Sequence, residues 1–359
     1  MTRLIVLAAG GTGGHVFPAE ALAAELLSRG LRLALVTDKR GQAYGGTLGS
    51  LETHRISAGG VAGRGLASRA RGLAELAWGA LQAGPLLRRL KPAAVVGFGG
   101  YASLPTMFAA SRSGLPTLIH EQNAVLGRAN RLLAGRVGRV ATCYANVLHM
   151  PAEARIVQTG MPVRPAVAAM RDVPYERPDG ALRLLVLGGS QGARVLSEVL
   201  PAAIALLPED LRARLDIGQQ CRPEDIEGAR AAYAALGLAP ILETFFRDVP
   251  ERLAAAHLVV ARAGASTVAE LTALGRPAIL VPYPHAIDDP QTANAHALDE
   301  CGGGWLMPQP AFTPEALASR LRSLFEQPDT LVKAAACARA AGRPDAALRL
   351  ADSVMEAMP

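Results

Sequence analysis

The chain has 359 residues, half of them hydrophobic and 19% charged, which is typical of a globular protein long enough for two domains. It contains no run of about 18 apolar residues, so no membrane-spanning helix is expected. Residues 1–165 carry 19 Lys and Arg against 7 Asp and Glu, a net charge of +12, whereas residues 166–359 carry 18 against 24, a net charge of −6. The basic half predicts a large anionic partner. Because only 4% of residues are aromatic and no nucleic-acid-binding signature is present, an anionic membrane surface is favoured over nucleic acid.

The first half of the chain alternates apolar segments with helical ones. Leu4–Ala8 predicts a buried strand, which leads into the glycine loop Gly10-Gly11-Thr12-Gly13-Gly14-His15. Pro18 suits the first turn of the helix that follows, and this helix is expected to end near Arg29. Further strands are expected at 31–37, 93–97 and 117–120. This alternation predicts a parallel sheet with right-handed crossovers.

A helical stretch lies between the second and third of these strands. One of its stripes is apolar and is assigned to the core: Leu73, Leu76, Ala77, Ala80 and Leu81. Trp78 and Leu86 fall off that stripe and are flanked by basic residues that include Arg88 and Arg89, a mixture of apolar and basic character that predicts a face for anionic lipid. The alternative is that Trp78 packs under a loop and the arginines form a solvated face.

The residue composition changes near the middle of the chain. Prolines are frequent between Gly160 and Ala181, which predicts a linker. The alternation restarts with Leu182–Leu187 and a second glycine loop, Gly188-Gly189-Ser190-Gln191-Gly192. Two α/β domains that each open with such a loop indicate a cleft between them, although doubly wound folds can simply begin in this way.

A third strand–turn–helix unit lies further on. Leu258–Ala261 is an apolar strand, and Gly264-Ala265-Ser266-Thr267-Val268-Ala269-Glu270 leads into a helix that is expected to stop at Gly275. A helix N-terminus at the carboxyl end of a strand is a site for phosphate, and Glu270 could accept hydrogen bonds from sugar hydroxyls. Thr267 and Glu270 also have the spacing of a capping box, in which Glu270 would only satisfy backbone donors.

Several types of cofactor site are absent from the sequence. Neither glycine loop is a Walker A or a G-x-G-x-x-G motif, although Asp38, at the end of a predicted strand, keeps a nicotinamide-dependent dehydrogenase open as an alternative. The chain has no D-x-D triplet, and its four scattered cysteines (Cys143, Cys221, Cys301 and Cys337) lack metal-ligand spacing. No metal is therefore expected to be required, with Mg²⁺ at most stimulatory.

Together the glycine motifs resemble those of a known family. Gly10-Gly11-Thr12-Gly13-Gly14-His15, Gly97-Phe98-Gly99-Gly100-Tyr101 and Gly188-Gly189-Ser190-Gln191-Gly192, with His120-Glu121-Gln122-Asn123 and the segment from Gly264 to Glu270, are similar to the motifs of the MurG family. These enzymes are N-acetylglucosaminyltransferases of bacterial peptidoglycan synthesis. The resemblance runs in order from residue 4 to about residue 298.

The resemblance implies the GT-B fold, an α/β architecture of two Rossmann-like parallel-sheet domains that face a cleft. Residues 1–165 would form the N-terminal acceptor and membrane-associated domain, and residues 166–340 the UDP-GlcNAc-binding domain. Residues 341–359 would form a C-terminal helix that packs back on the first domain.

The site residues implied by the resemblance lie in both domains. Glu270 would bind the ribose hydroxyls, and the backbone of Phe246 would contact uracil. Gln291 and Asn123 would read the sugar, although Pro290 stands where the family commonly has His, and Arg164 would help to close the nucleotide site. The residues expected near the diphosphate are Thr12, Gly13, Gly14, Ser190, Ala265, Ser266, Thr267, Val268 and Ala269.

The implied reaction moves GlcNAc from UDP-GlcNAc to the C4 hydroxyl of a lipid-linked muramoyl-pentapeptide acceptor, with inversion and an oxocarbenium-like transition state. His15 is the candidate general base, because the ordinary pKa of histidine suits proton transfer near neutrality; a structural role in orienting the glycine loop is the alternative. The enzyme would lie peripherally on the cytoplasmic face of the bacterial inner membrane, with other cell-wall synthesis proteins as further partners. A UDP-sugar epimerase of the same fold is the second alternative function.

Overall fold

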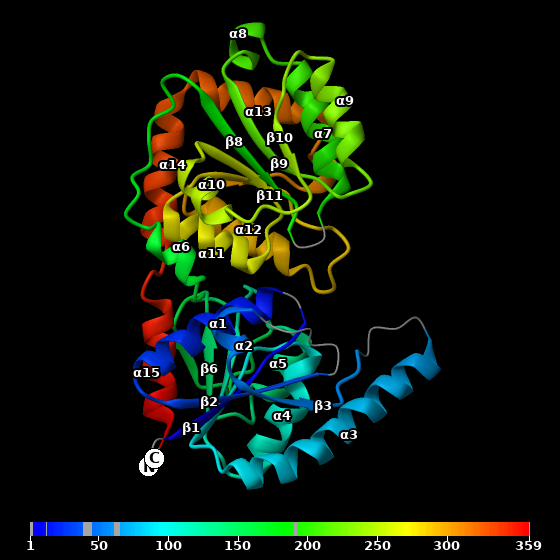
Figure 1. Cartoon of the computed structure of the whole chain (residues 1–359), viewed down its shortest axis with the longest axis vertical. Coiled ribbons are helices and arrows are strands. Elements are labelled where there is room, and N and C mark those ends of the chain that lie inside the picture. Colours follow the sequence, from blue (N-terminus) through cyan, green and yellow to red (C-terminus); the bar gives the residue numbers. More distant parts are fainter. Residues whose placement is uncertain (1–2, 12, 39–44, 61–64, 190–191, 359) are drawn as a thin grey trace. The chain divides into compact units, whose positions relative to one another are not determined.

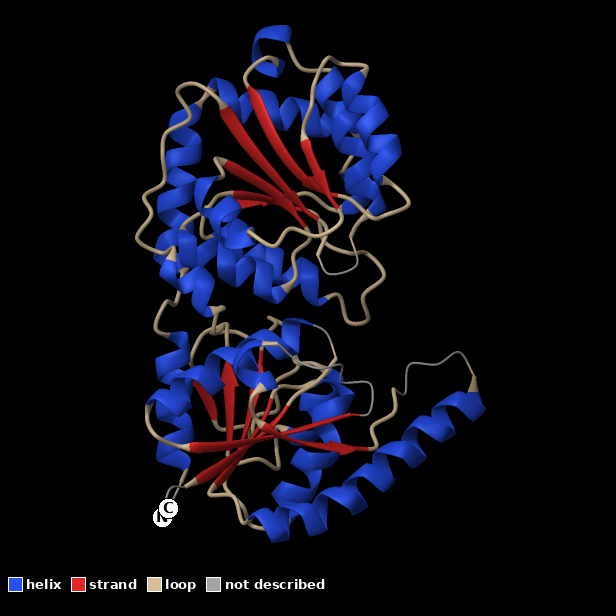
Figure 2. Ribbon diagram, viewed as in Figure 1, coloured by secondary structure: helices blue, strands red, loops and turns tan. Residues whose placement is uncertain are grey.

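The computed structural model describes residues 3–11, 13–38, 45–60, 65–189 and 192–358. The chain divides into two compact units, each with helices on both faces of a parallel sheet (Figures 1 and 2). Unit 1 comprises Met1–Arg164 and Pro344–Pro359, and unit 2 comprises Pro165–Arg343. The predicted architecture of two parallel-sheet α/β domains is therefore confirmed.

The strands of unit 1 pair in parallel in the order β3-β2-β1-β4-β5-β6-β7. They are β1 (Leu4–Ala8), β2 (Arg32–Asp38), β3 (Glu52–Ile56), β4 (Ala94–Gly97), β5 (Thr117–Glu121), β6 (Arg139–Thr142) and β7 (Ile156–Gln158). The helices are α1 (Gly13–Ser28), α2 (Gly46–Gly49), α3 (Leu66–Leu90), α4 (Gly100–Arg112), α5 (Arg128–Leu133) and α15 (Ala346–Ala357).

Strand β1 shows why this sheet is buried on both faces. Ile5 and Leu7 belong to a core cluster with residues of α1 and α15, whereas Val6 and Ala8 belong to a second cluster with residues of α3 and α4. Because successive side chains point to opposite faces, a continuous apolar run is what a strand between two helical layers requires.

The C-terminal helix α15 packs against α1 in unit 1 (Figure 1). Leu350 and Val354 are fully buried in the core cluster that includes β1. Arg29 of α1 donates from Nη1 to Asp352 Oδ1 at 2.5 Å, and Arg139 of β6 donates from Nη1 to Glu356 Oε2 at 2.7 Å. The end of the chain is therefore part of the first unit's core.

The strands of unit 2 pair in parallel in the order β10-β9-β8-β11-β12-β13. They are β8 (Leu182–Leu187), β9 (Leu215–Gln220), β10 (Ile241–Glu243), β11 (Leu258–Ala261), β12 (Ala278–Leu280) and β13 (Gly304–Leu306). The helices are α6 (Pro165–Ala169), α7 (Arg194–Ala205), α8 (Glu209–Arg212), α9 (Ile226–Ala234), α10 (Val249–Ala255), α11 (Ala265–Leu274), α12 (Pro290–Glu300), α13 (Pro314–Glu326) and α14 (Pro328–Ala341), with a 3-10 turn η1 at Gln309–Ala311.

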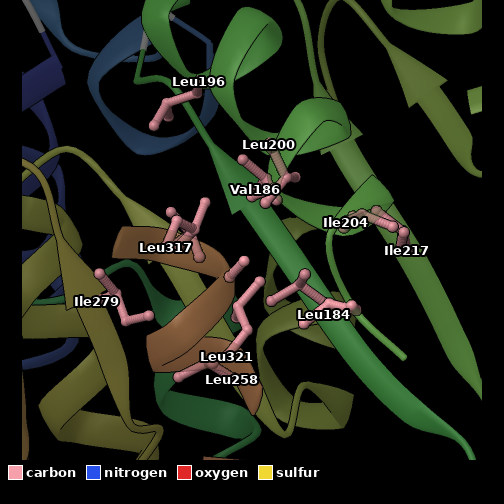
Figure 3. Packing of buried hydrophobic residues seen from close by; sticks show 14 of the residues in the cluster. Leu184, Val186, Leu196, Leu200, Ile204, Ile217, Leu258, Ile279, Leu317 and Leu321 are labelled. Atoms are coloured by element: carbon pink, nitrogen blue, oxygen red, sulfur yellow. The ribbon is translucent and has the colours of Figure 1, made fainter. Parts of the chain in front are cut away.

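The core of unit 2 lies between this sheet and helices α7 and α13. Leu184 and Val186 of β8 pack with Leu200 of α7 and with Leu317 and Leu321 of α13 (Figure 3). These side chains belong to one contiguous buried cluster. Its burial fixes β8 and β11, whose carboxyl ends carry the loops of the candidate site.

One local prediction is wrong. Helix α1 begins at Gly13, so Pro18 lies inside the helix rather than in its first turn, and it lacks the N–H that would bond to the carbonyl of Gly14. The boundary between the two units, at Arg164 and Pro165, falls inside the predicted linker, which also contains the short helix α6 (Pro165–Ala169).

The buried face of α3 also differs from the prediction. Leu73 and Leu81, assigned to the core, are 58% and 67% exposed, whereas Gly72, Gly79, Ala83 and Leu87 are buried. A Cβ at Gly79 would lie 1.9 Å from the carbonyl oxygen of Ser57, so α3 approaches the chain before it through a face of small residues. Leu73 and Leu81 are therefore left exposed to solvent.

The face predicted for lipid is corrected in one position. Trp78 is 58% exposed and Arg88 and Arg89 are exposed, whereas Leu86 is only partly exposed and packs against the core. The alternative in which Trp78 packs under a loop is therefore wrong. Among the described residues, no helix is long and apolar enough to cross a membrane.

Candidate active site

In each unit the predicted residues lie in the loops and helices that follow strands of the parallel sheet, as expected for an open sheet of this kind. In unit 1, β1 leads into α1 and β4 leads into α4. Gly13, Gly14, His15, Asn123 and Arg164 all belong to this unit. Thr12 lies outside the described residues.

The His15 ring lies against the start of α4. Cβ atoms at Gly99 and Gly100 would lie 3.3–3.5 Å from its ring atoms, and both glycines have positive φ, +81° and +69°. A side chain at either position would be strained and would crowd the ring. No group among the described residues hydrogen-bonds to the buried Nδ1 of His15. The fold therefore holds this imidazole on the glycine loops, with one ring nitrogen unpaired within the described part of the chain.

Residues His120 and Gln122 anchor the loop after β5. His120 is fully buried, with Nε2 3.1 Å from the carbonyl oxygen of Gly160 and Nδ1 3.1 Å from Nε2 of Gln122. The amide NH₂ of Gln122 also donates to the carbonyl of Phe98 at 2.9 Å. The pKa of His120 is lowered from 6.5 to about 4, mainly by burial and to a smaller extent by the nearby His15, while the bond to Gly160 opposes the shift. His120 is therefore neutral near pH 7.

Glu121 organises the next part of this loop, a role that the sequence analysis missed. Its Oε1 accepts from the backbone N–H of Asn123 at 3.0 Å and from Asn123 Nδ2 at 3.3 Å. Its Oε2 accepts from the N–H of Gly127 at 2.9 Å and from Asn130 Nδ2 at 2.8 Å. The carboxylate, only 1% exposed, thus fixes Asn123 in one orientation. The sequence feature that could have indicated this role is a glutamate at the end of a predicted buried strand.

Arg164 lies at the end of unit 1, beside the first glycine loop. Its guanidinium carbon is 4.9 Å from the centroid of the Phe17 ring in α1, a cation–π contact. Arg164 and the α1 residues are therefore neighbours within one unit.

Unit 2 presents the start of α11 at the end of β11. The helix begins at Ala265, and its N-cap is Gly264, which has no side chain to cap the first-turn N–H groups. Thr267 is the third residue of the helix, so the capping-box explanation of Glu270 is wrong. The hydroxyl of Ser266 is buried and has no hydrogen-bond partner among the described residues. Glu270 follows one turn later and is 6% exposed.

The glycine loop after β8 lies near the same edge. A Cβ at Gly188 would lie 2.6 Å from the N atom of Ala193, so the loop folds back closely on itself. Gly192 packs against the stem of Arg222, which is held by Asp225 through bonds of 2.6 and 2.8 Å. Ser190, predicted to meet the diphosphate, lies outside the described residues.

Helix α12 carries Gln291 and Asn294. Pro290 is its first residue, a position that suits proline, and Asp289 caps it by accepting from the N–H of Thr292 at 3.3 Å. Gln291 Oε1 accepts from the N–H of Tyr283 at 2.9 Å. Asn294 is fully buried and donates from Nδ2 to the carbonyl of Ala263 at 3.2 Å. Pro290 is therefore part of a regular helix start, and Asn294 ties α12 to the segment before α11.

Phe246 lies in the loop that follows β10, and its side chain is buried. It is 3% exposed, and the guanidinium carbon of Arg252 lies 4.2 Å from its ring centroid. With the side chain fixed in this way, the backbone of Phe246 can act as a recognition surface. Among the described residues, no group of three or more His, Cys, Asp or Glu side chains could hold a metal ion.

Comparison with known proteins identifies the family to which the chain belongs. The model of the glycosyltransferase family 28 N-terminal domain matches residues 5–142, and that of the family 28 C-terminal domain matches residues 183–350. Two curated relatives, from Paramagnetospirillum magneticum and Rhodospirillum rubrum, are each 66% identical to the chain. The alignments cover 99% and 98% of this chain and 97% and 91% of the relatives. Both relatives are named UDP-N-acetylglucosamine–N-acetylmuramyl-(pentapeptide) pyrophosphoryl-undecaprenol N-acetylglucosamine transferase.

Comparison with solved structures supports the same family and the same fold. The crystal structure of Acinetobacter baumannii MurG matches with a TM-score of 0.81 at 30% identity, over 99% of this chain and 100% of that one. A Listeria monocytogenes protein described as a UDP-N-acetylglucosamine 2-epimerase matches with a TM-score of 0.68 at 16% identity, which is a likeness of fold alone.

Proposed function

Because the chain belongs to the MurG family within glycosyltransferase family 28, we propose that it transfers N-acetylglucosamine from its UDP donor to N-acetylmuramyl-(pentapeptide) pyrophosphoryl-undecaprenol. The acceptor's C4 hydroxyl attacks the anomeric carbon of the donor. The bond from that carbon to the diphosphate breaks, UDP leaves with the electron pair, and the configuration inverts. No metal site is needed for this scheme.

The observation that carries the donor half is the start of α11. Gly264 leaves the first-turn N–H groups without a side-chain cap, and the buried Ser266 hydroxyl has no partner among the described residues. Such a helix start favours a diphosphate, whose charge grows as UDP departs. The buried carboxylate of Glu270, one turn further on, accepts from the ribose hydroxyls, and the Phe246 backbone contacts uracil. Gln291 donates from its amide NH₂ to the sugar.

The acceptor half is assigned to unit 1. His15 is assigned as the general base, because its ring is held against Gly99 and Gly100 at the first glycine loop. A positioned base contributes roughly 10²–10⁴ to the rate of such a step. Asn123, fixed by Glu121, contacts the sugar, and Arg164 assists at the nucleotide.

Helix α3 is assigned to the membrane, since the acceptor has a lipid tail. Leu73, Trp78 and Leu81 are exposed on it, and Arg88 and Arg89 are exposed in its last turn. Each basic residue near an anionic surface contributes about 1 kcal/mol, so this mixture supports reversible, peripheral attachment. We place the enzyme on the cytoplasmic face of the inner membrane, where the UDP donor is available.

The test is a transfer assay with UDP-GlcNAc and a short-chain muramoyl-pentapeptide pyrophosphoryl lipid. The expected product carries GlcNAc in a β linkage at C4 of the muramoyl sugar, identified by its anomeric proton coupling in NMR. Conversion of UDP-GlcNAc to its C2 epimer without an acceptor, or a product that retains the α configuration, would overturn the proposal.

A further inference from the structure

Arg262, one residue beyond β11, is a half-buried cation whose guanidinium contacts neutral groups. Its Nη1 donates to the carbonyl oxygens of Val281 at 3.1 Å and Pro282 at 3.0 Å, and its Nη2 donates to Gln309 Oε1 at 2.8 Å. The guanidinium carbon lies 5.6 Å from the centroid of the Tyr283 ring. Burial lowers the pKa of Arg262, and no carboxylate among the described residues pairs with it. These carbonyls, this amide and this ring therefore determine where the guanidinium lies.

The segment that Arg262 holds is the one that orients Gln291. Val281, Pro282 and Tyr283 follow β12 and begin the loop that leads to α12. The N–H of Tyr283 donates to Gln291 Oε1 at 2.9 Å, so the carbonyl end of the Gln291 amide faces this loop. The NH₂ end of the same amide is thereby directed away from the loop. Any shift of the Val281–Tyr283 backbone would displace both ends of the amide.

We propose that Gln309 and Arg262 are positioning residues for recognition of the transferred sugar, acting through the Val281–Tyr283 backbone on Gln291. This inference rests on the proposed function, in which Gln291 contacts the sugar of the donor. Gln309 lies in the turn η1 after β13 and is separated from Gln291 by all of α12. None of the proposed donor contacts involves it, so sequence motifs around the nucleotide site give no reason to expect this role.

The physical effect of losing Gln309 follows from the hydrogen bonds of its half-buried partner. In Gln309→Leu the Nη2 group of Arg262 loses its protein acceptor, and the guanidinium moves to recover a partner for this charged donor. The carbonyls of Val281 and Pro282 then lose their fixed donor, and Gln291 loses its orientation. Gln309→Glu keeps an acceptor at the same chain length and turns the hydrogen bond into an ion pair, so it should preserve the arrangement.

The experiment separates sugar recognition from nucleotide binding. For the wild type, Gln309→Leu and Gln309→Glu, the affinities for UDP and UDP-GlcNAc are measured by calorimetry, and kcat/KM is compared for UDP-GlcNAc and its C4 epimer UDP-GalNAc. Gln309→Leu should bind UDP with wild-type affinity but lose about tenfold in discrimination between the two sugars, the scale of one misplaced hydrogen bond. Gln309→Glu should keep the wild-type discrimination between the two sugars. Because discrimination is the ratio of the two kcat/KM values, any change in diphosphate affinity cancels from it. Gln327→Leu, an exposed glutamine at the end of α13, is the matched control and should equal the wild type.

A double-mutant comparison removes any effect of general destabilisation. In a Gln291→Ala background, Gln309→Leu should change the discrimination no further, because its action passes through Gln291. Equal losses for UDP and UDP-GlcNAc, unchanged discrimination in Gln309→Leu, or additive losses in the double variant would each overturn the positioning role. Failure of the proposed function is distinguishable, since it would appear as absence of transfer by the wild type, whereas the calorimetric comparison needs no acceptor.

Discussion

The buried imidazole of His120 makes the stability of unit 1 sensitive to acid. One ring nitrogen faces a carbonyl, that of Gly160, and the other faces the amide NH₂ of Gln122. Only the neutral tautomer with a proton on Nε2 satisfies both partners, because it donates to the carbonyl and accepts from the amide. Burial, together with the nearby His15, lowers the pKa of His120 to about 4.

The sign of the effect follows from proton binding in the two states. An unfolded histidine has a pKa of about 6.5, so below that pH the unfolded chain binds a proton that the folded chain excludes. The stabilising contribution of neutral His120 should therefore be fully present above pH 6.5. The free energy of unfolding of unit 1 should fall as the pH is lowered from 6.5 towards 4. The loss should be roughly 2 kcal/mol at pH 5 and roughly 3 kcal/mol at pH 4.

The assay is urea-dependent hydrogen exchange of the β5 amides at pH 7.5 and pH 5.0, corrected for intrinsic exchange rates. His120→Gln cannot titrate, so its pH dependence should be flatter than that of the wild type by roughly 2 kcal/mol, even though it is less stable at pH 7.5. Equal pH dependence in the two proteins would refute the reasoning. His257, whose pKa burial also lowers to about 4, lies in unit 2 and should not affect β5.

Three further outcomes are expected. Leu350→Ala should lower the free energy of unfolding of unit 1 by about 2–5 kcal/mol through the cavity that it leaves, as measured by urea denaturation; a loss below about 1 kcal/mol would mean that α15 is not part of the core. Transfer activity should persist in excess EDTA, and complete loss that stoichiometric metal restores would contradict a metal-independent reaction. Combining Trp78→Ala with Arg88→Glu and Arg89→Glu should weaken sedimentation with anionic liposomes and raise KM for a long-chain acceptor, while activity on a short-chain acceptor survives. Unchanged liposome binding by this folded variant would place the membrane face elsewhere.

The central strands were predictable because they are buried on both faces. β1 and β11 are uninterrupted apolar runs and β8 is apolar apart from Arg183, a glycine follows each of them within three residues, and the structure gives them the predicted bounds. β3 (Glu52–Ile56) has only one buried residue, and β10 (Ile241–Glu243) also has one. Edge strands of this kind carry little hydrophobic signal, so the sequence analysis did not find them.

The errors on α3 and α11 have different physical causes. The apolar stripe of α3 was taken as its core face, but the helix packs through Gly72 and Gly79, and small residues add little to a hydrophobic pattern. On α11 the spacing of Thr267 and Glu270 fitted a capping box, yet Gly264 is the cap, which is decided by backbone geometry. The spacing of residues alone could not show whether Thr267 or Gly264 is the N-cap.

Long-range contacts account for what the sequence could not give at the site. The Asn123 amide is oriented by Glu121, and this pairing is local enough to be suspected from the sequence. The link from Gln309 to Arg262 joins residues 47 positions apart and becomes visible only when β11 and η1 are placed in the same unit.

The most direct test of the central claim, that the donor binds at the start of α11, compares UDP with 2′-deoxyuridine diphosphate. The account predicts that the wild type prefers UDP by about tenfold, the scale of a hydrogen bond to a charged group. It also predicts that Glu270→Ala binds both nucleotides equally and raises KM for UDP-GlcNAc at least about tenfold with little change in Tm. If Glu270→Ala retains both the preference and the wild-type KM, the ribose does not lie at Glu270 and the assignment of the donor site is wrong.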